Sequence, residues 1–153
     1  MKPRLNFHEA APEIMQPVFR LNKAVDECGL EKSLLHLVKL RASQINGCSF
    51  CVDMHSREAR QDGETEQRLH LVAAWRESPL FSERERAAFL WTETLTRLSD
   101  GPVSDKVYET ARGQFEEEEL VKLSVAVSMI NTWNRLCVGF RAIHPVRSEA
   151  KAA

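Results

Sequence analysis

The stretch EKSLLHLVKLRASQINGCSFCVDMHSREARQDG, residues 31–63, contains two predicted helices separated by Asn46-Gly47. In the first, from about Glu31 to Ile45, apolar side chains recur every three or four residues, which is the pattern of a helix with one buried face. Asn46-Gly47 then supplies the left-handed backbone geometry that ends such a helix. The second helix is expected to begin near Cys48 and to end at Asp62-Gly63.

Helices with the same periodicity are predicted on both sides of this pair. The upstream helix runs from about Ile14 to Cys28, is started or kinked by Pro17, and is ended by Gly29. The downstream helices are a segment with Leu69, Val72 and Trp75 that ends before Pro79, a helix opened by the Ser82-x-x-Glu85 capping box, a short helix after Ser104, and a long helix from the acidic run 116–119 to Cys137.

The sequence shows neither sustained alternation of apolar and polar residues nor a repeat of fixed period. The predicted fold is therefore an all-α, orthogonal helical bundle. We expect one domain over residues 1–145, followed by a disordered tail over residues 146–153.

The composition is that of one globular domain with nearly equal numbers of basic and acidic residues. The 153 residues are 43% hydrophobic, and 21 Lys and Arg against 22 Asp and Glu give a net charge of −1. This balance indicates neither nucleic-acid nor membrane binding. The apolar runs are too short to span a bilayer, and the start MKPRLNFHEA does not resemble a secretory signal, so we expect a cytoplasmic protein.

Cys48, Cys51 and His55 occur at positions i, i+3 and i+7, so a helix places their side chains on one face. We expect Cys48 in the first helical turn, where free N–H groups and the positive end of the dipole stabilise a thiolate. His55 follows Cys51 by one turn and can take its proton or stabilise it as an ion pair. This is the pattern of an activated dithiol.

Two neighbouring thiols permit a peroxidase cycle, in which one thiolate attacks a peroxide, becomes a sulfenic acid and is captured by the other as a disulfide. We expect Cys51 to attack and Cys48 to resolve, although the helix dipole favours the reverse order. A zinc site is the main alternative, with Cys48, Cys51 and His55 as ligands and His36 or Cys28 as a fourth. In a third interpretation both cysteines are small buried hydrophobic residues.

The remaining cysteines and histidines carry weaker signals. Cys28 and Cys137 lie on apolar helix faces and are interpreted as buried packing residues. His8, His70 and His144 are interpreted as surface residues. A polar and aromatic cluster near the end of the last helix either closes a pocket or an interface, or simply packs; it consists of Asn131, Trp133, Asn134 and Arg135.

The pattern E-x11-C-x-x-C-x3-H, preceded by S-Q-I-N-G, is the signature of alkylhydroperoxidase D-like proteins in the carboxymuconolactone decarboxylase superfamily, and this sequence resembles it. The resemblance extends to SERERAAF at 82–89 and INTWNRL at 130–136. It implies an all-helical fold, assembly as trimers or hexamers, and a dithiol that reduces hydroperoxides without a cofactor. The dithiol would be re-reduced by a dihydrolipoyl-type or similar thiol donor.

The sequence departs from this signature at one position, because His36 stands where the family has a relay glutamate. An imidazole can shuttle a proton but carries no permanent negative charge. A catalytic role for His36 and an ordinary packing role both stay open. The C-x-x-C pair indicates the redox branch of the superfamily, since its decarboxylase members lack the pair. A relative with decarboxylase, isomerase or adaptor function is the alternative.

Overall fold

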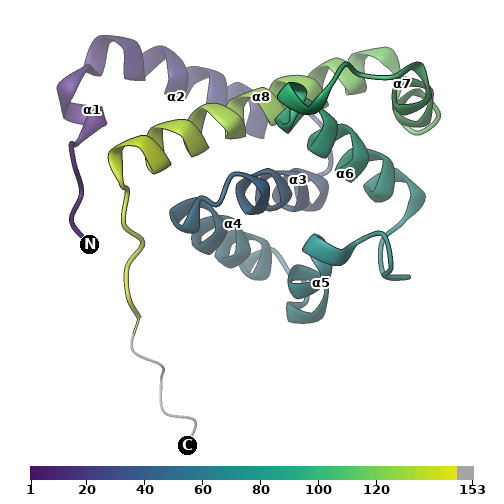
Figure 1. The fold of residues 1–153 in the computed structure, drawn as a ribbon, viewed down its shortest axis with the longest axis horizontal. Coiled ribbons are helices and arrows are strands. Elements are labelled where there is room, and N and C mark those ends of the chain that lie inside the picture. Colours follow the sequence, from purple (N-terminus) through teal and green to yellow (C-terminus); the bar gives the residue numbers. More distant parts are fainter. Residues whose placement is uncertain (148–153) are drawn as a thin grey trace, which may run out of the picture.

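The computed structural model describes residues 1–147, and over this range the protein is all-α, as the sequence predicts (Figure 1). Of the expected tail over residues 146–153, residues 148–153 lie outside the described residues. The elements are α1 (Phe7–Ala10), α2 (Pro12–Asp26), α3 (Lys32–Ile45), α4 (Ser49–Gln61), α5 (Glu66–Leu71), the 3-10 helix η1 (Val72–Ala74), α6 (Glu83–Thr96), the 3-10 helix η2 (Leu98–Asp100), α7 (Asp105–Arg112) and α8 (Glu117–Phe140).

Two segments differ from the sequence-based expectation. Helix α2 begins at Pro12, and Pro17 lies inside it. Pro12 suits a helix start because the N–H group that it lacks has no partner in the first turn. The segment around Val72 is a short α-helix that tightens into η1, and the Trp75 indole beyond it donates a hydrogen bond of 2.8 Å to Glu93 on α6. This tertiary contact lies outside what helical periodicity can predict.

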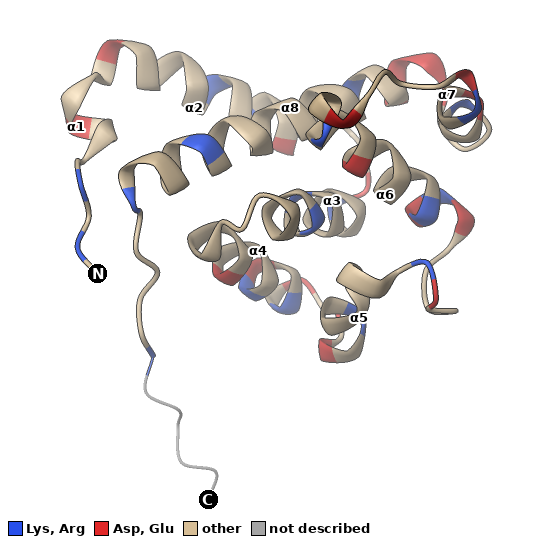
Figure 2. Ribbon diagram, viewed as in Figure 1, with Lys and Arg blue, Asp and Glu red and all other residues tan. Residues whose placement is uncertain are grey.

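Helix α3 is the centre of the bundle and contacts α4, α6 and α8 (Figure 1). Helix α2 packs along α8, so the N-terminal segment covers the end of α8 that faces α4. Charged residues of both signs are spread over the helices, whereas the middle of α8 is uncharged (Figure 2). This distribution agrees with burial of α8 between the other helices. Within residues 1–147, no helix combines the length and apolar character needed to cross a bilayer.

The turn between α3 and α4 has the hydrogen bonds of a Schellman motif. Gly47 adopts φ +64°, a conformation that favours glycine, and its N–H donates to the Gln44 carbonyl at 3.2 Å. The Cys48 N–H donates to the Ser43 carbonyl at 3.0 Å. Cys48 has extended backbone angles and is the N-cap residue of α4. The sequence places it one position too far into the helix, but the break at Gly47 is confirmed.

A buried carboxylate joins α3 and α6. The Glu93 side chain is 8% exposed and accepts hydrogen bonds from Arg41 (2.8 Å), Arg76 (2.7 Å) and Trp75 (2.8 Å). Burial by itself would raise the pKa of Glu93, but the hydrogen bonds from Arg76, Trp75 and Arg41 lower it below its ordinary value. Glu93 is therefore ionised at neutral pH and holds the two helices together.

Candidate active site: three thiols beside a cavity

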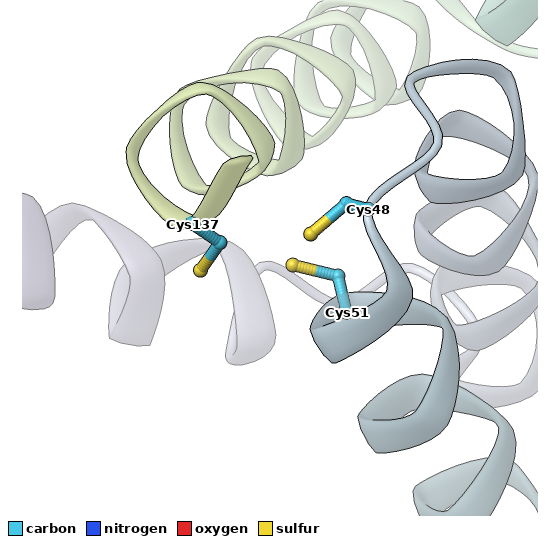
Figure 3. Close-up of side chains that lie close together, drawn as sticks. All are labelled: Cys48, Cys51 and Cys137. Atoms are coloured by element: carbon cyan, nitrogen blue, oxygen red, sulfur yellow. The ribbon is translucent and has the colours of Figure 1, made fainter. Parts of the chain in front are cut away.

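Three buried thiols meet where the start of α4 packs against α8 (Figure 3). The sulfur atoms of Cys48, Cys51 and Cys137 all lie within 4.8 Å of one another. The Cys48 and Cys51 side chains both point toward α8, from which Cys137 projects (Figure 3). Together with Ile130 and Phe7 they belong to one small apolar cluster. The thiols of Cys48 and Cys51 thus lie close together, as the sequence predicts, and the thiol of Cys137 lies beside them.

The turn that carries Cys48 is fixed to α8 by side-chain amides. The Asn46 amide donates to the side-chain oxygens of Asn131 (3.0 Å) and Asn134 (2.9 Å). Asn134 in turn donates to the Ser43 hydroxyl at 3.0 Å, and both Asn131 and Asn134 are buried. These residues, for which the sequence left pocket closure and packing open, therefore hold the dithiol turn against α8.

A cavity of about 860 Å³ opens in front of the thiols. Cys51 and Cys137 are among the described residues that line it, and Cys48 is not. Its wall is largely apolar and aromatic, with Phe50, Met54, Ile130 and Trp133 among the lining residues. Of the two cysteines of the C-x-x-C pair, Cys51 is therefore the one that lines the cavity.

Aromatic side chains from the N-terminal helices also line the cavity. His8 stacks on Phe19 with ring centroids 5.4 Å apart, and Phe19 lies 5.3 Å from Trp133. The Trp133 indole donates a hydrogen bond of 2.8 Å to Asn22 on α2. His8 is exposed, as expected for a surface residue, but it also lines the cavity.

His55 is buried beside the cavity and is oriented by a carboxylate. Its Nδ1 atom lies 3.0 Å from a carboxylate oxygen of Glu58. Its Nε2 atom is buried and has no hydrogen-bond partner within residues 1–147. Burial lowers the pKa of His55 below its ordinary value, and the hydrogen bond to Glu58 only partly opposes this. A neutral imidazole that donates from Nδ1 presents an unprotonated Nε2, which is the state that a base requires.

His36 also lies at the cavity and is paired with a carboxylate. Its Nε2 atom is 2.6 Å from an oxygen of Asp62, which also forms an ion pair of 2.8 Å with Lys32. The Nδ1 atom of His36 is buried without a partner among the described residues. Asp62 therefore places a carboxylate beside His36 at the cavity.

The cysteines of this cluster differ in the direction in which their pKa is shifted. The thiols of Cys137 and Cys51 lower the pKa of Cys48 well below its ordinary value, against the effect of burial. The same contacts raise the pKa of Cys51, with Cys137 as the larger cause and Cys48 as the next. The neighbouring thiols are therefore the largest cause of the lowered pKa of Cys48, whereas the sequence argument relied on the helix dipole.

The side chains that could bind a metal ion together differ from those that the sequence suggested. Within residues 1–147, the group of three or more potential ligands whose donor atoms converge is Cys48, Cys51 and Cys137. His55, His36 and Cys28 do not belong to it. The predicted set of two cysteines and His55 is therefore not assembled in this structure. Cys28 instead packs against a different apolar cluster.

Sequence reasoning missed three partners of the site. Glu58 follows His55 by three positions, a spacing that places both on one helix face and could have revealed the pair. Asp62 reaches His36 from another helix, and Cys137 reaches the dithiol from α8. Neither of these two leaves a local signal, because their spacing along the chain is set by how the helices pack.

The fold and the site define the class to which the protein belongs: an all-α bundle in which a C-x-x-C dithiol begins a helix and a histidine follows one turn later. Residues 12–94 match the carboxymuconolactone decarboxylase family. The protein belongs to this family.

Relatives support this assignment over nearly the whole chain. An uncharacterized protein of Bacillus subtilis, YdfG, is 37% identical over 90% of this chain and 94% of its own. A solved structure from Agrobacterium tumefaciens, a protein of unknown function whose name suggests the antioxidant defence protein AhpD, is 49% identical, with a TM-score of 0.93 over 95% of this chain and all of its own.

A more distant solved structure shares the fold. The peroxidase-related protein from Ralstonia eutropha, described as an alkylhydroperoxidase AhpD core, has a TM-score of 0.80 and 18% identity over 90% of this chain and 74% of its own. At this identity the likeness concerns the arrangement of helices. The bundle is thus of the AhpD-like type that the sequence predicts.

Proposed function

We propose that the protein is a thiol-dependent peroxidase that reduces organic hydroperoxides through a Cys48–Cys51 dithiol–disulfide cycle. The observation that carries the proposal is the placement of Cys51. Cys51 lines a large, mostly apolar cavity, its sulfur lies within 4.8 Å of the Cys48 sulfur, and the buried His55 base lines the same cavity. Names that suggest antioxidant or peroxidase roles among the relatives support the same function.

The cycle begins with loss of the Cys51 proton, which passes to Nε2 of His55 through water in the cavity that both residues line, because no hydrogen bond joins the two side chains among the described residues. The Cys51 sulfur then attacks the terminal oxygen of the hydroperoxide, the O–O bond breaks, and the alcohol leaves with the proton returned from His55. Cys51 is now a sulfenic acid. The Cys48 sulfur attacks it, water leaves with the hydroxyl oxygen, and the Cys48–Cys51 disulfide forms.

Access and charge point to different cysteines for the first step. The thiolate is favoured at Cys48, whereas the cavity reaches Cys51. Because the substrate would bind in the cavity, which Cys51 lines and Cys48 does not, the placement of Cys51 outweighs the charge at Cys48. We assign the attack to Cys51 and the resolving step to Cys48, whose thiolate is ready to attack the sulfenic acid.

The cavity also supports a class of substrate. An aromatic and aliphatic wall removes apolar surface from water when an organic hydroperoxide binds, and hydrogen peroxide gains nothing from it. Re-reduction requires a dithiol donor, for which we propose a dihydrolipoyl-type protein or a similar thiol. This cycle suits the cytoplasmic location expected from the sequence, because that compartment keeps thiols reduced.

We also propose a homo-oligomer, as trimer or hexamer. Large apolar side chains are exposed on α2 and α8; they are Ile14, Phe19, Leu21, Val121 and Val138. Apolar surface of this kind marks interaction faces. Light scattering of the purified protein would test the assembly, and a monomer at micromolar concentration would contradict it.

The decisive experiment is a free-thiol count before and after one equivalent of cumene hydroperoxide, with mass spectrometry to locate any new bond. Loss of two thiols and one equivalent of alcohol formed would support the proposal. Cys51→Ser should abolish peroxide consumption, and Cys28→Ser, which removes a thiol that packs against a different apolar cluster and does not line the cavity, should leave it unchanged. Thiols that survive peroxide treatment, with or without bound zinc, would contradict the proposed function.

A further inference from the structure

Cys137 is a thiol that the cycle above does not use, although it belongs to the same cluster. Its sulfur lies within 4.8 Å of both Cys48 and Cys51, and it is 5% exposed. It comes from α8, whereas the other two come from the start of α4 (Figure 3). Side-chain rotation has to close such a gap to about 2.05 Å to form a disulfide.

The cavity distinguishes the three sulfurs by their surroundings. Cys51 and Cys137 are among the described residues that line the cavity. Cys48, at the Schellman turn, is not one of them. A Cys48–Cys51 disulfide therefore presents only one of its two sulfurs to a reductant in the cavity. A Cys51–Cys137 disulfide would present both.

On the basis of the proposed peroxidase function, we propose that Cys137 is a third redox residue. It replaces Cys48 in the disulfide with Cys51, so that both cysteines of the new disulfide line the cavity. The Cys137 sulfur attacks the Cys51 sulfur of the Cys48–Cys51 disulfide. The Cys51–Cys137 bond forms, the Cys48–Cys51 bond breaks, and its electron pair leaves on Cys48. The proton of Cys137 passes to the thiolate released on Cys48, whose sulfur lies within 4.8 Å. The number of disulfides is unchanged, so the exchange needs no oxidant.

The charges of the cluster favour attack by Cys137 on the disulfide. Thiol–disulfide exchange begins with a thiolate as the nucleophile, so the ionisation of Cys137 governs this step. The pKa of Cys137 is raised, chiefly by its contact with Cys48. That contact loses its charge when Cys48 enters a disulfide, so the Cys137 thiol becomes easier to ionise at the moment when it has to attack.

The same geometry allows Cys137 to resolve a sulfenic acid directly when Cys48 is absent. This gives a test that separates the two proposals. In the Cys48→Ser variant, a serine takes the N-cap position of α4, for which serine is among the preferred residues, so the fold should be retained. Far-ultraviolet circular dichroism checks this before the thiols are analysed.

Trypsin separates the relevant cysteines. Cys48 and Cys51 lie in the peptide 42–57, Cys137 in the peptide 136–141, and Cys28 in the peptide 24–32. A Cys48–Cys51 disulfide therefore lowers the mass of one peptide by two hydrogens. A Cys51–Cys137 disulfide joins two peptides into a new species that mass spectrometry identifies directly.

The experiment treats the full-length protein and the Cys48→Ser variant with one equivalent of cumene hydroperoxide in the presence of dimedone, followed by alkylation and digestion. We expect the joined peptides 42–57 and 136–141 as the main product of the variant. We expect both kinds of disulfide in the unaltered protein. The double variant with Cys137→Ala should instead carry a dimedone adduct on Cys51, which is the matched control.

Two results would overturn the proposal in different ways. If the Cys48→Ser variant accumulates the dimedone adduct at Cys51 while Cys137 is still alkylated, Cys137 takes no part, and the peroxidase function stands. If Cys51 reacts with peroxide neither in the variant nor in the unaltered protein, both proposals fail.

Discussion

The Nδ1 atom of His55 lies 3.0 Å from the Glu58 carboxylate, one turn further along α4, and this contact determines which nitrogen of the ring is free. Glu58 is ionised, because the hydrogen bond from His55 lowers its pKa below the ordinary value. An anion at Nδ1 holds the proton there. Nε2 is then the basic nitrogen, and it is the one without a partner among the described residues.

The buried histidine predicts the acid limb of the pH profile. His55 acts as a base when neutral, and burial lowers its pKa, so the neutral form persists below the ordinary pKa of about 6.5. We expect kcat/KM for cumene hydroperoxide to hold as the pH falls to 6.5 and to decline only below it, which a pH series measures. An acid limb centred at or above pH 6.5 would contradict a buried neutral base.

Glu58→Gln removes the charge that raises the pKa of His55, so the acid limb should move to lower pH. The proton at Nδ1 is also held less firmly, and we expect kcat/KM to fall by about 10- to 100-fold, which is at most the lower limit of what acid–base catalysis contributes, because His55 itself is retained. Glu66→Gln on α5 is the matched control, because it removes an exposed carboxylate that pairs with Arg60. Equal effects of both substitutions would rule out an orienting role for Glu58.

If His36 relays protons, replacing its imidazole should slow turnover. We expect His36→Gln to lower kcat for cumene hydroperoxide by about tenfold, because glutamine cannot exchange a proton. His36→Glu, which restores the residue of the family signature, should retain most of the activity. His70→Gln, at an exposed histidine, is the control. Activity of His36→Gln equal to that of the unaltered protein would make His36 a packing residue.

The cavity predicts how substrate size affects the enzyme. Met54 lines the cavity and is half-buried, so Met54→Trp should fill part of its volume. We expect KM for cumene hydroperoxide to rise about tenfold, equivalent to roughly 1.4 kcal/mol of lost binding. Turnover of hydrogen peroxide by the same variant is the internal control and should not change. A parallel loss with both peroxides would indicate damage to the site itself.

The Glu93 carboxylate predicts different costs for its two arginines. The Arg41 side chain is 11% exposed, and Arg76 is 53% exposed. Arg41→Met leaves a buried charge short of a partner, and we expect the free energy of unfolding to fall by about 3 kcal/mol. Arg76→Met should cost at most about 1 kcal/mol. Urea unfolding at one fixed protein concentration measures both, and equal losses would show that burial does not govern this pair.

Local features allowed the fold class and half of the site to be predicted from the sequence. Helical periodicity and the Gly47 break depend on neighbours along the chain, and the structure confirms both. The Cys48, Cys51 and His55 spacing likewise lies within one helix. The fine structure of residues 66–75 was not predictable, because Trp75 is held by Glu93 from a different helix.

The sequence by itself determined an all-α bundle and a dithiol followed by a histidine, since both follow from distances of a few residues along a helix. Only the tertiary structure decided which groups surround that dithiol. Cys137 arrives from α8 and Asp62 from the far end of α4, at positions set by how the helices cross. Packing also decided that Cys51 lines the cavity while Cys48 does not, because which side of a helix start meets a cavity depends on the neighbouring helices.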